Sequence, residues 1–179
     1  TTLAPHPRPS GTGFGKNRRW RWVPLLEATN GDGKIGGAAA ALILNGKAPF
    51  EGGVYLSIPI TDSGFFQQPQ VAESVASVVE RMLDGVFLYE GGSRYFAYVD
   101  GEQVDLGAEV ANFGRRRATV QIALSVTETK THKSVFEKTL SLSVESVNRR
   151  TVQAIWSPDQ FSPQDYVVKV TLTRDGKAI

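Results

Sequence analysis

The feature that most constrains this chain is a strict alternation of apolar and polar residues through its C-terminal half. In residues 120–126 every second residue is Val, Ile or Leu, and the residues between them are small or polar. The same alternation recurs in residues 104–110, 140–144, 152–156 and 166–172. Because successive side chains of a β-strand point to opposite faces, such segments, each bounded by turn residues, predict an antiparallel β-sandwich.

The N-terminal half has a different periodicity. Val71, Val75, Val78, Val79 and Met82 repeat with the spacing of one apolar helical stripe. Proline suits the first position of a helix and glycine commonly follows the last. We therefore expect a helix that begins at Pro69 and stops at Gly85.

Strands are expected on both sides of this helix. Residues 18–29 and 35–45 flank an Asn30–Gly33 turn, which predicts a hairpin. The second of these strands, and the strand 54–58, are nearly all apolar, so we expect both to be buried on two faces. After the helix, Val86–Tyr89 and Arg94–Val99 are expected to form a last hairpin that turns at residues 90–93.

The predicted fold class is α+β, a small mixed α/β unit followed by an antiparallel sandwich. We expect residues 1–17, which contain three prolines and three glycines, to be a linker or arm. The mixed unit should cover residues 18–100 and the sandwich residues 101–179. The chain has no initiator methionine and stops just after an Asp175-Gly176 turn, so we expect it to be a piece of a larger polypeptide.

Composition excludes several kinds of site. With 41% hydrophobic and 21% charged residues the 179-residue chain has the profile of a globular protein, and no apolar run is long enough to cross a bilayer. It has no cysteine, so disulfides, thiolate metal sites and cysteine nucleophiles are excluded, and we expect no cofactor and no metal. Arg115–Arg117 and the other basic clusters fall at predicted turns, so we expect no nucleic-acid partner.

Two resemblances bear on the fold. Residues 108–114, the Trp156–Pro158 corner and the strand from Tyr166 to Val170 resemble the immunoglobulin-like sandwich modules of large bacterial carbohydrate-active and cell-surface proteins. Residues 21–28, 36–41 and 53–56, with Phe65 and Phe66 before the helix, resemble the C-terminal part of a glutamine-amidotransferase-like, flavodoxin-like domain embedded in multidomain glycosidases. The nucleophilic cysteine of that family would lie upstream, so the resemblance implies no catalytic residue in this chain.

Candidate binding residues are aromatic. Trp20, Trp22, Phe65 and Phe66, with Tyr89, could form a platform on which sugar rings stack, although core packing explains the same residues. Glycoside hydrolysis needs two facing carboxylates, and nothing in the sequence singles out a pair. The acidic residues considered are Glu27, Glu51, Asp62 and Glu90.

Two functions remain open from the sequence. The first is a noncatalytic accessory or structural module of a larger secreted or periplasmic bacterial carbohydrate-active protein, a glycoside hydrolase being the parent considered. The second is an enzyme fragment that contributes one wall of a glycoside hydrolase active site. In both cases the expected partners are the rest of the parent polypeptide or a second copy, and a polysaccharide.

Overall fold

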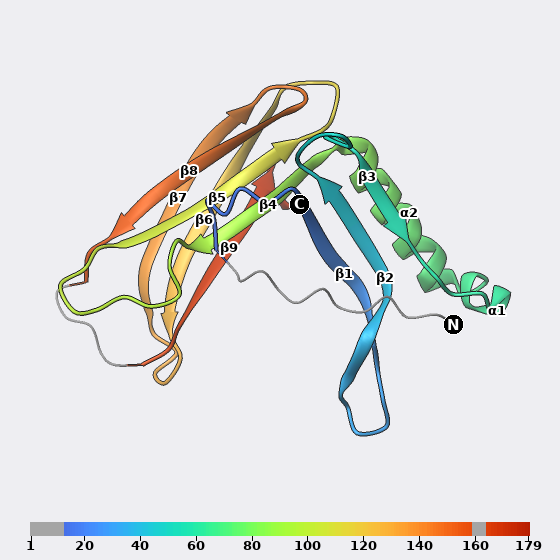
Figure 1. Cartoon of the computed structure of the whole chain (residues 1–179), viewed down its shortest axis with the longest axis horizontal. Coiled ribbons are helices and arrows are strands. Elements are labelled where there is room, and N and C mark those ends of the chain that lie inside the picture. Colours follow the sequence, from blue (N-terminus) through green and yellow to red (C-terminus); the bar gives the residue numbers. More distant parts are fainter. Residues whose placement is uncertain (1–12, 159–163) are drawn as a thin grey trace. The chain divides into compact units, whose positions relative to one another are not determined.

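The computed structural model describes residues 13–158 and 164–179, which form two compact units (Figure 1). Among these residues, unit 1 comprises 18–84, and unit 2 comprises 13–17 together with 85–158 and 164–179. Along the chain, the described residues of unit 1 therefore lie between two segments of unit 2. Most of the chain is antiparallel β-sheet.

Unit 1 contains a three-stranded antiparallel sheet in the order β1-β2-β3. Its strands are β1 (Trp20–Thr29), β2 (Ile35–Asn45) and β3 (Val54–Ser57). The predicted hairpin between β1 and β2 is confirmed. The Asn30 side-chain oxygen accepts hydrogen bonds from the backbone amides of Asp32 and Lys34, and Gly33 takes a φ of 75°.

The two strands that were expected to be buried on both faces differ. In β2 the residues from Ala38 to Leu42 are all buried, as expected. In β3 the side chains alternate between half-buried and exposed, and Tyr55 is 51% exposed. The expectation for β3 is wrong because this strand is short and lies at the edge of its sheet.

The helical segment of unit 1 consists of α1 (Ser63–Phe66) and α2 (Pro69–Asp84). The Asp62 carboxylate accepts a hydrogen bond from the Gly64 amide and caps α1. As predicted, α2 begins at Pro69 and stops before Gly85, whose φ is 75°. None of the sixteen residues of α2, all of which the structure describes, is buried. The apolar stripe therefore lines a space rather than filling a core.

Unit 2 is a sandwich of two antiparallel sheets (Figure 1). The first sheet has the order β4-β5-β8 and contains β4 (Val86–Ser93), β5 (Val104–Asn112) and β8 (Asn148–Trp156). The second has the order β10-β9-β6-β7 and contains β6 (Ala118–Glu128), β7 (Ser134–Val144), β9 (Tyr166–Arg174) and β10 (Lys177–Ala178). The sandwich that the alternation predicted is confirmed.

The core of unit 2 lies between these sheets. In β6 the apolar residues of the alternation are buried and the residues between them are largely exposed. They pack against Leu106 and Val110 of β5. Asn112, at the end of β5, is fully buried and satisfied, because its amide donates to the carbonyls of Arg116 and Val144 and its oxygen accepts from the Gly114 amide. This asparagine therefore fixes the turn that leads into β6.

The predicted hairpin after the helix is wrong. The strand β4 continues to Ser93 and pairs with β5, whereas residues 94–103 form a loop. The sequence predicts a turn at Gly91 and Gly92, but these glycines allow close approach instead. A Cβ at Gly91 would lie 3.2 Å from the side chain of Val170, and one at Gly92 would lie 3.2 Å from the backbone of Gly13. The units accordingly divide between Asp84 and Gly85, earlier than the sequence suggested.

The described part of the N-terminal arm belongs to the sandwich. Residues 13–17, which we call the strap, lie along β4. The Gly13 amide donates to the Gly91 carbonyl at 3.1 Å, and the Lys16 amide donates to the Glu90 carboxylate at 2.8 Å. Phe14 is 1% exposed, and a Cβ at Gly107 would lie 2.8 Å from its ring. The rest of the expected linker, 1–12, and part of the expected corner, 159–163, lie outside the described residues.

Candidate functional site

Unit 2 contains an aromatic cleft with a volume of about 670 Å³. Its lining comes from the loop after β4, from inward residues of β5, β6 and β8, and from the start of β9. The lining residues are Ser93, Phe96, Ala97, Tyr98, Asp100, Val104, Val126, Trp156, Gln164, Asp165, Tyr166 and Val168. We refer to this site as the cleft.

The aromatic side chains at one side of the cleft come from strands. Trp156 at the end of β8 packs edge to face against Tyr166 at the start of β9, with ring centroids 5.5 Å apart. Phe136 of β7 supports the same indole at 6.4 Å. Trp156 is buried, so it is fixed in the sandwich core and contributes an apolar surface. Binding residues on strands are held more precisely than those on loops.

The other side of the cleft is the loop 94–103, which is ordered by hydrogen bonds. The Tyr98 hydroxyl accepts from the Tyr95 amide at 3.2 Å and donates to the Asp105 carbonyl at 3.4 Å. The Ser93 hydroxyl donates to the Tyr95 carbonyl, and the Val99 amide donates to the Glu102 carboxylate. These bonds hold the loop in a shape that leaves Phe96 fully exposed to solvent beside the cleft.

The cleft combines apolar surfaces with a few polar groups. Its polar side chains are those of Ser93, Gln164, Asp100, Asp165 and the two tyrosines. Ligand sites are typically concave and mostly apolar, with a small number of polar groups that fix orientation. A ligand with flat apolar faces and hydroxyl groups at its edges would match both kinds of surface.

The aromatic residues that the sequence singled out lie elsewhere. Trp20 and Trp22 lie on β1, and Trp20 is 46% exposed. Phe65 and Phe66 lie on α1, with their rings edge to face at 5.2 Å. All four belong to unit 1, and their role in binding sugars stays a prediction. Tyr89 of β4 is fully buried, so it cannot serve as a platform for a ligand.

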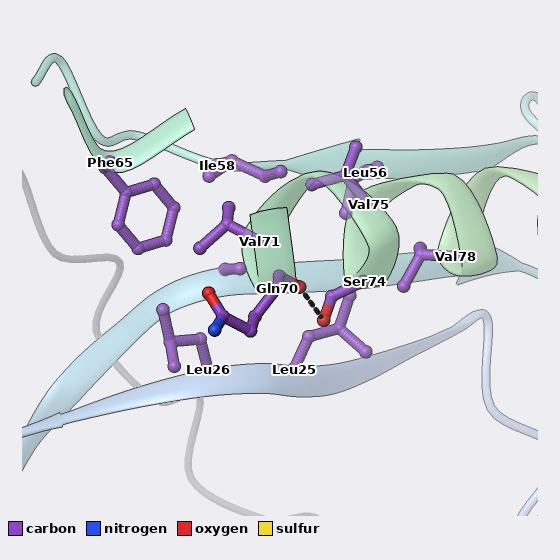
Figure 2. A pocket seen from close by; sticks show the side chains of 11 residues that line it. Leu25, Leu26, Leu56, Ile58, Phe65, Gln70, Val71, Ser74, Val75 and Val78 are labelled. Carbon is purple, nitrogen blue, oxygen red and sulfur yellow. Dashed lines mark hydrogen bonds between the residues drawn. The ribbon is translucent and has the colours of Figure 1, made fainter. Parts of the chain in front are cut away.

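A second cavity of about 370 Å³ lies in unit 1 between α2 and one face of the sheet (Figure 2). Among its lining residues, Phe65 is the only one of the four aromatic candidates. Leucines 25 and 26 of β1 face Val71 and Val75 of α2 across this space. The full lining is Leu25, Leu26, Ala40, Leu56, Ile58, Phe65, Gln70, Val71, Ser74, Val75 and Val78.

The acidic residues considered from the sequence have different environments. Asp62 caps α1, and Glu90 of β4 is buried where its carboxylate accepts the Lys16 amide of the strap. Glu27 and Glu51 are exposed in unit 1, on β1 and in the turn after β2. None of the four lines the cleft. In the ranges 13–158 and 164–179, no three His, Asp or Glu side chains are grouped so that they could hold a metal ion.

Sequence reasoning missed the cleft. The available signal was the run Tyr95, Phe96 and Tyr98 between the Gly91-Gly92 pair and Gly101. Three aromatic residues within a glycine-bounded segment match either an alternating strand or a loop that exposes its rings. The cleft became visible only when the structure placed this loop beside Trp156 and Tyr166.

Comparisons with known proteins give distant structural neighbours. No protein-family model matches the sequence, and no curated protein matches it. A β-glucuronidase from glycoside hydrolase family 2 is 13% identical with a TM-score of 0.37, over 54% of this chain and 10% of that chain. A glycosyl hydrolase family 2 member from Bacteroides cellulosilyticus is 15% identical with a TM-score of 0.40, over 82% of this chain and 16% of that chain.

A third neighbour has a different activity. The alkylpurine DNA glycosylase AlkC of Pseudomonas fluorescens, solved bound to DNA containing an abasic site analogue, is 9% identical with a TM-score of 0.39, over 63% of this chain and 38% of that chain. This chain thus spans well under half of each of these three neighbours. At these TM-scores the likenesses carry no functional argument, so the cleft is the basis for assigning a function. Within the described residues no helix is long and apolar enough to cross a membrane.

Proposed function

We propose that this chain is a noncatalytic accessory module of a larger, secreted or periplasmic carbohydrate-active protein, and that it binds a glycan in the cleft of unit 2. The observation that carries the proposal is the fully exposed ring of Phe96 beside a cleft lined by Tyr98, Trp156 and Tyr166. The resemblance of this half of the sequence to sandwich modules of such proteins supports the same function.

Exposure of Phe96 has a free-energy cost that the fold does not recover. Burying a phenylalanine side chain stabilises a protein by about 1.5–3 kcal/mol relative to leaving it in water. The hydrogen bonds of Tyr98 and Ser93 nevertheless hold the loop so that this ring stays outside the core. An exposed aromatic residue beside a concave surface is a common feature of binding sites, where the ligand covers the ring.

The remaining surface of the cleft fits a sugar ring. The apolar C–H face of a sugar can stack on an aromatic ring, while its hydroxyl groups lie in the ring plane and need hydrogen-bond partners. Asp100, Asp165 and Gln164 supply acceptors and donors within the same lining. This combination of apolar surface and a few polar groups provides both burial and orientation.

The rival function, one wall of a glycoside hydrolase active site, also has an observation in its favour. Asp100 and Asp165 line one cleft, and glycoside hydrolysis uses a pair of carboxylates on either side of the scissile bond. The two functions differ in one measurable respect. Only the glycoside hydrolase function requires a chain that contains both carboxylates to hydrolyse a glycan.

The test is glycan binding by the chain and by Phe96→Ala, measured by isothermal titration calorimetry on a panel of neutral oligosaccharides. We expect binding by the chain and a loss of about tenfold in the variant, which corresponds to about 1.4 kcal/mol. Because Phe96 is fully exposed, the variant should keep the stability of the parent chain. The matched control is Phe50→Ala, which removes an exposed ring of unit 1.

Equal affinity of Phe96→Ala and the unmodified chain for every glycan would contradict the proposed site. Release of reducing sugar by the chain, abolished in Asp100→Asn or Asp165→Asn, would contradict the accessory role and support the rival.

A further inference from the structure

The cavity of unit 1 coincides with a change of side-chain size along one face of β2. Residues 40, 42 and 44 share that face, because successive side chains of a strand alternate between faces. Leu42 and Leu44 are large and buried, whereas Ala40, which lines the cavity, presents only a methyl group. The sequence thus places a small residue at the cavity and large residues beyond it.

A β-bulge directs two consecutive leucines into the same space. The pairing of β1 with β2 shifts between Pro24 and Leu26, so Leu25 has no residue opposite it. In a regular strand Leu25 and Leu26 would point to opposite faces. Both line the cavity instead, and Figure 2 shows both side chains on the side of β1 that faces α2. Bulges that redirect a side chain are over-represented next to active sites, so this irregularity is a second sign that the space takes a ligand.

The chemistry of the lining is apolar and uncharged. The described lining residues include no Asp, Glu, Lys, Arg or His, and only Gln70 and Ser74 are polar. The Ser74 hydroxyl donates to the Gln70 backbone carbonyl at 2.7 Å, so its proton is already used within the helix (Figure 2). An apolar cavity of about 150 Å³ binds benzene. At about 370 Å³ this cavity has room for a larger molecule of the same chemistry.

The cavity is elongated and has an entrance. On the helix its lining runs from Gln70 to Val78, which corresponds to about 12 Å at the rise of an α-helix. Leu25 and Leu26 are each 41% exposed, so the space opens to solvent along β1. A volume of about 370 Å³ drawn out over this length suits a single hydrocarbon chain.

From these observations we infer that unit 1 binds an uncharged molecule with an alkyl chain, of the kind found in fatty alcohols and acyl esters, and that the chain lies between α2 and the sheet. Removal of the half-exposed leucines from water drives binding. The exposed Gln70 amide, which can both donate and accept, bonds to the hydroxyl or ester group at the end of the chain. This site is separate from the cleft and does not depend on the proposed function.

The first experiment measures displacement of N-phenylnaphthylamine, an uncharged dye whose fluorescence rises in apolar surroundings, by hexanol, octanol and decanol. Each methylene group that enters the cavity should tighten binding by up to about fourfold, so octanol should bind at least about threefold more tightly than hexanol. Ala40→Leu fills part of the space and should weaken decanol binding by at least about tenfold. The matched control is Val79→Leu, which adds a methylene group to a 43% exposed residue of α2 outside the lining and should change the affinity by less than about twofold.

The second experiment leaves the cavity unaltered, so it decides the question even if Ala40→Leu does not fold. A ligand that binds the folded state raises its unfolding temperature. Decanol should raise the unfolding temperature of unit 1, whose Trp20 and Trp22 report in a chain that carries Trp156→Phe. It should leave unit 2 unchanged, whose Trp156 reports in a chain that carries Trp20→Phe and Trp22→Phe.

Three results would overturn the inference. They are no binding of the dye or decanol by the unmodified chain, decanol binding by folded Ala40→Leu as tight as by the unmodified chain, and stabilisation of unit 2 by decanol in place of unit 1. The glycan test of the cleft uses Phe96→Ala in the other unit, so each of the two proposals can fail without the other.

Discussion

The two units of this chain use the same kind of sheet and bury it to different extents. In unit 2 the sheet that contains β6 faces a second sheet, and the residues from Val120 to Val126 that point inward are all buried. In unit 1 the sheet that contains β2 faces α2, and a cavity of about 370 Å³ separates them. Protein interiors normally contain few voids larger than a water molecule, so the second arrangement is the unusual one.

The difference follows from side-chain size. The inward residues of β6 are Val, Ile and Leu, which reach across to the opposite sheet. The central part of β2 is Ala38–Ala41, and an alanine presents only a methyl group. On the face toward α2, Ala40 lines the cavity together with valines of the helix, and its methyl group leaves the space beside it unfilled. An amphipathic pattern therefore predicts which helices and strands form, whereas side-chain volume decides whether the space between them is filled.

The largest expected difference between the units comes from removing a large side chain. Leu124→Ala in the sandwich core should lower the free energy of unfolding by about 2–5 kcal/mol, because the vacated space is enclosed. Leu56→Ala, which enlarges a cavity that is already open, should cost less than about 1.5 kcal/mol, since less surface is lost from contact. The measurement for Leu124→Ala is urea denaturation followed by tryptophan fluorescence. The chain also carries Trp20→Phe and Trp22→Phe, so that Trp156 is the remaining tryptophan and its fluorescence reports unit 2.

For Leu56→Ala the matching chain retains Trp20 and Trp22 and carries Trp156→Phe, so that fluorescence reports unit 1. Equal costs for the two leucine substitutions would show that unit 1 is packed as densely as the sandwich, and the comparison between the units would fail.

A smaller effect is expected where the strap meets the sandwich. A Cβ at Gly107 would lie 2.6 Å from the Val152 carbonyl oxygen and 2.8 Å from the Phe14 ring. Gly107→Ala should therefore cost about 1–3 kcal/mol, the usual range for overpacking. The control is Gly31→Ala, where an added Cβ meets nothing within 4 Å. If Gly107→Ala melts at the temperature of the unmodified chain, the strap does not pack against β5 as described.

A substitution of alanine by leucine should change stability in opposite directions in the two units, and its effect in unit 1 is the smallest that we expect. Ala40→Leu adds methylene groups at a position that lines the cavity, and each one buried stabilises by up to about 0.8 kcal/mol. We expect a gain of about 1 kcal/mol in unit 1, because part of the added surface stays exposed. Ala108→Leu adds the same atoms to a fully buried position of the sandwich and should cost about 1–3 kcal/mol. Thermal unfolding by circular dichroism gives both signs, and destabilisation by both substitutions would refute an open space in unit 1.

The sequence was sufficient for elements that are specified locally. The valine stripe with Pro69 and Gly85 gave the bounds of α2, and Asn30–Gly33 gave the turn between β1 and β2. The alternation of residues 120–126 gave both the strand β6 and the face that it buries. In each case neighbouring residues contain all the information that the element needs.

The sequence was insufficient where glycine allows contact with a distant segment. A glycine pair satisfies a tight turn and a close approach of two backbones equally well, and only the second depends on residues far along the chain. Gly91 lies close to the side chain of Val170, and Gly92 lies close to the backbone of Gly13. Because the pair was interpreted as a turn, β4 was predicted to end before Ser93, and part of the loop 94–103 was predicted to be a strand. The cleft was missed for the same reason, because its aromatic residues come from that loop, β8 and β9.

The strap also determines an order of events during synthesis. The Lys16 amide and the Glu90 carboxylate are 74 positions apart, with residues 18–84 of unit 1 between them. At roughly 5–20 residues per second, a ribosome needs about 4–15 s to make that intervening segment. During this interval Phe14 has no sandwich to enter, because β4 and β5 are made after β1, β2, β3 and α2. Residues 18–84 of unit 1 are therefore complete before the strands against which the strap packs, β4 and β5, have been made.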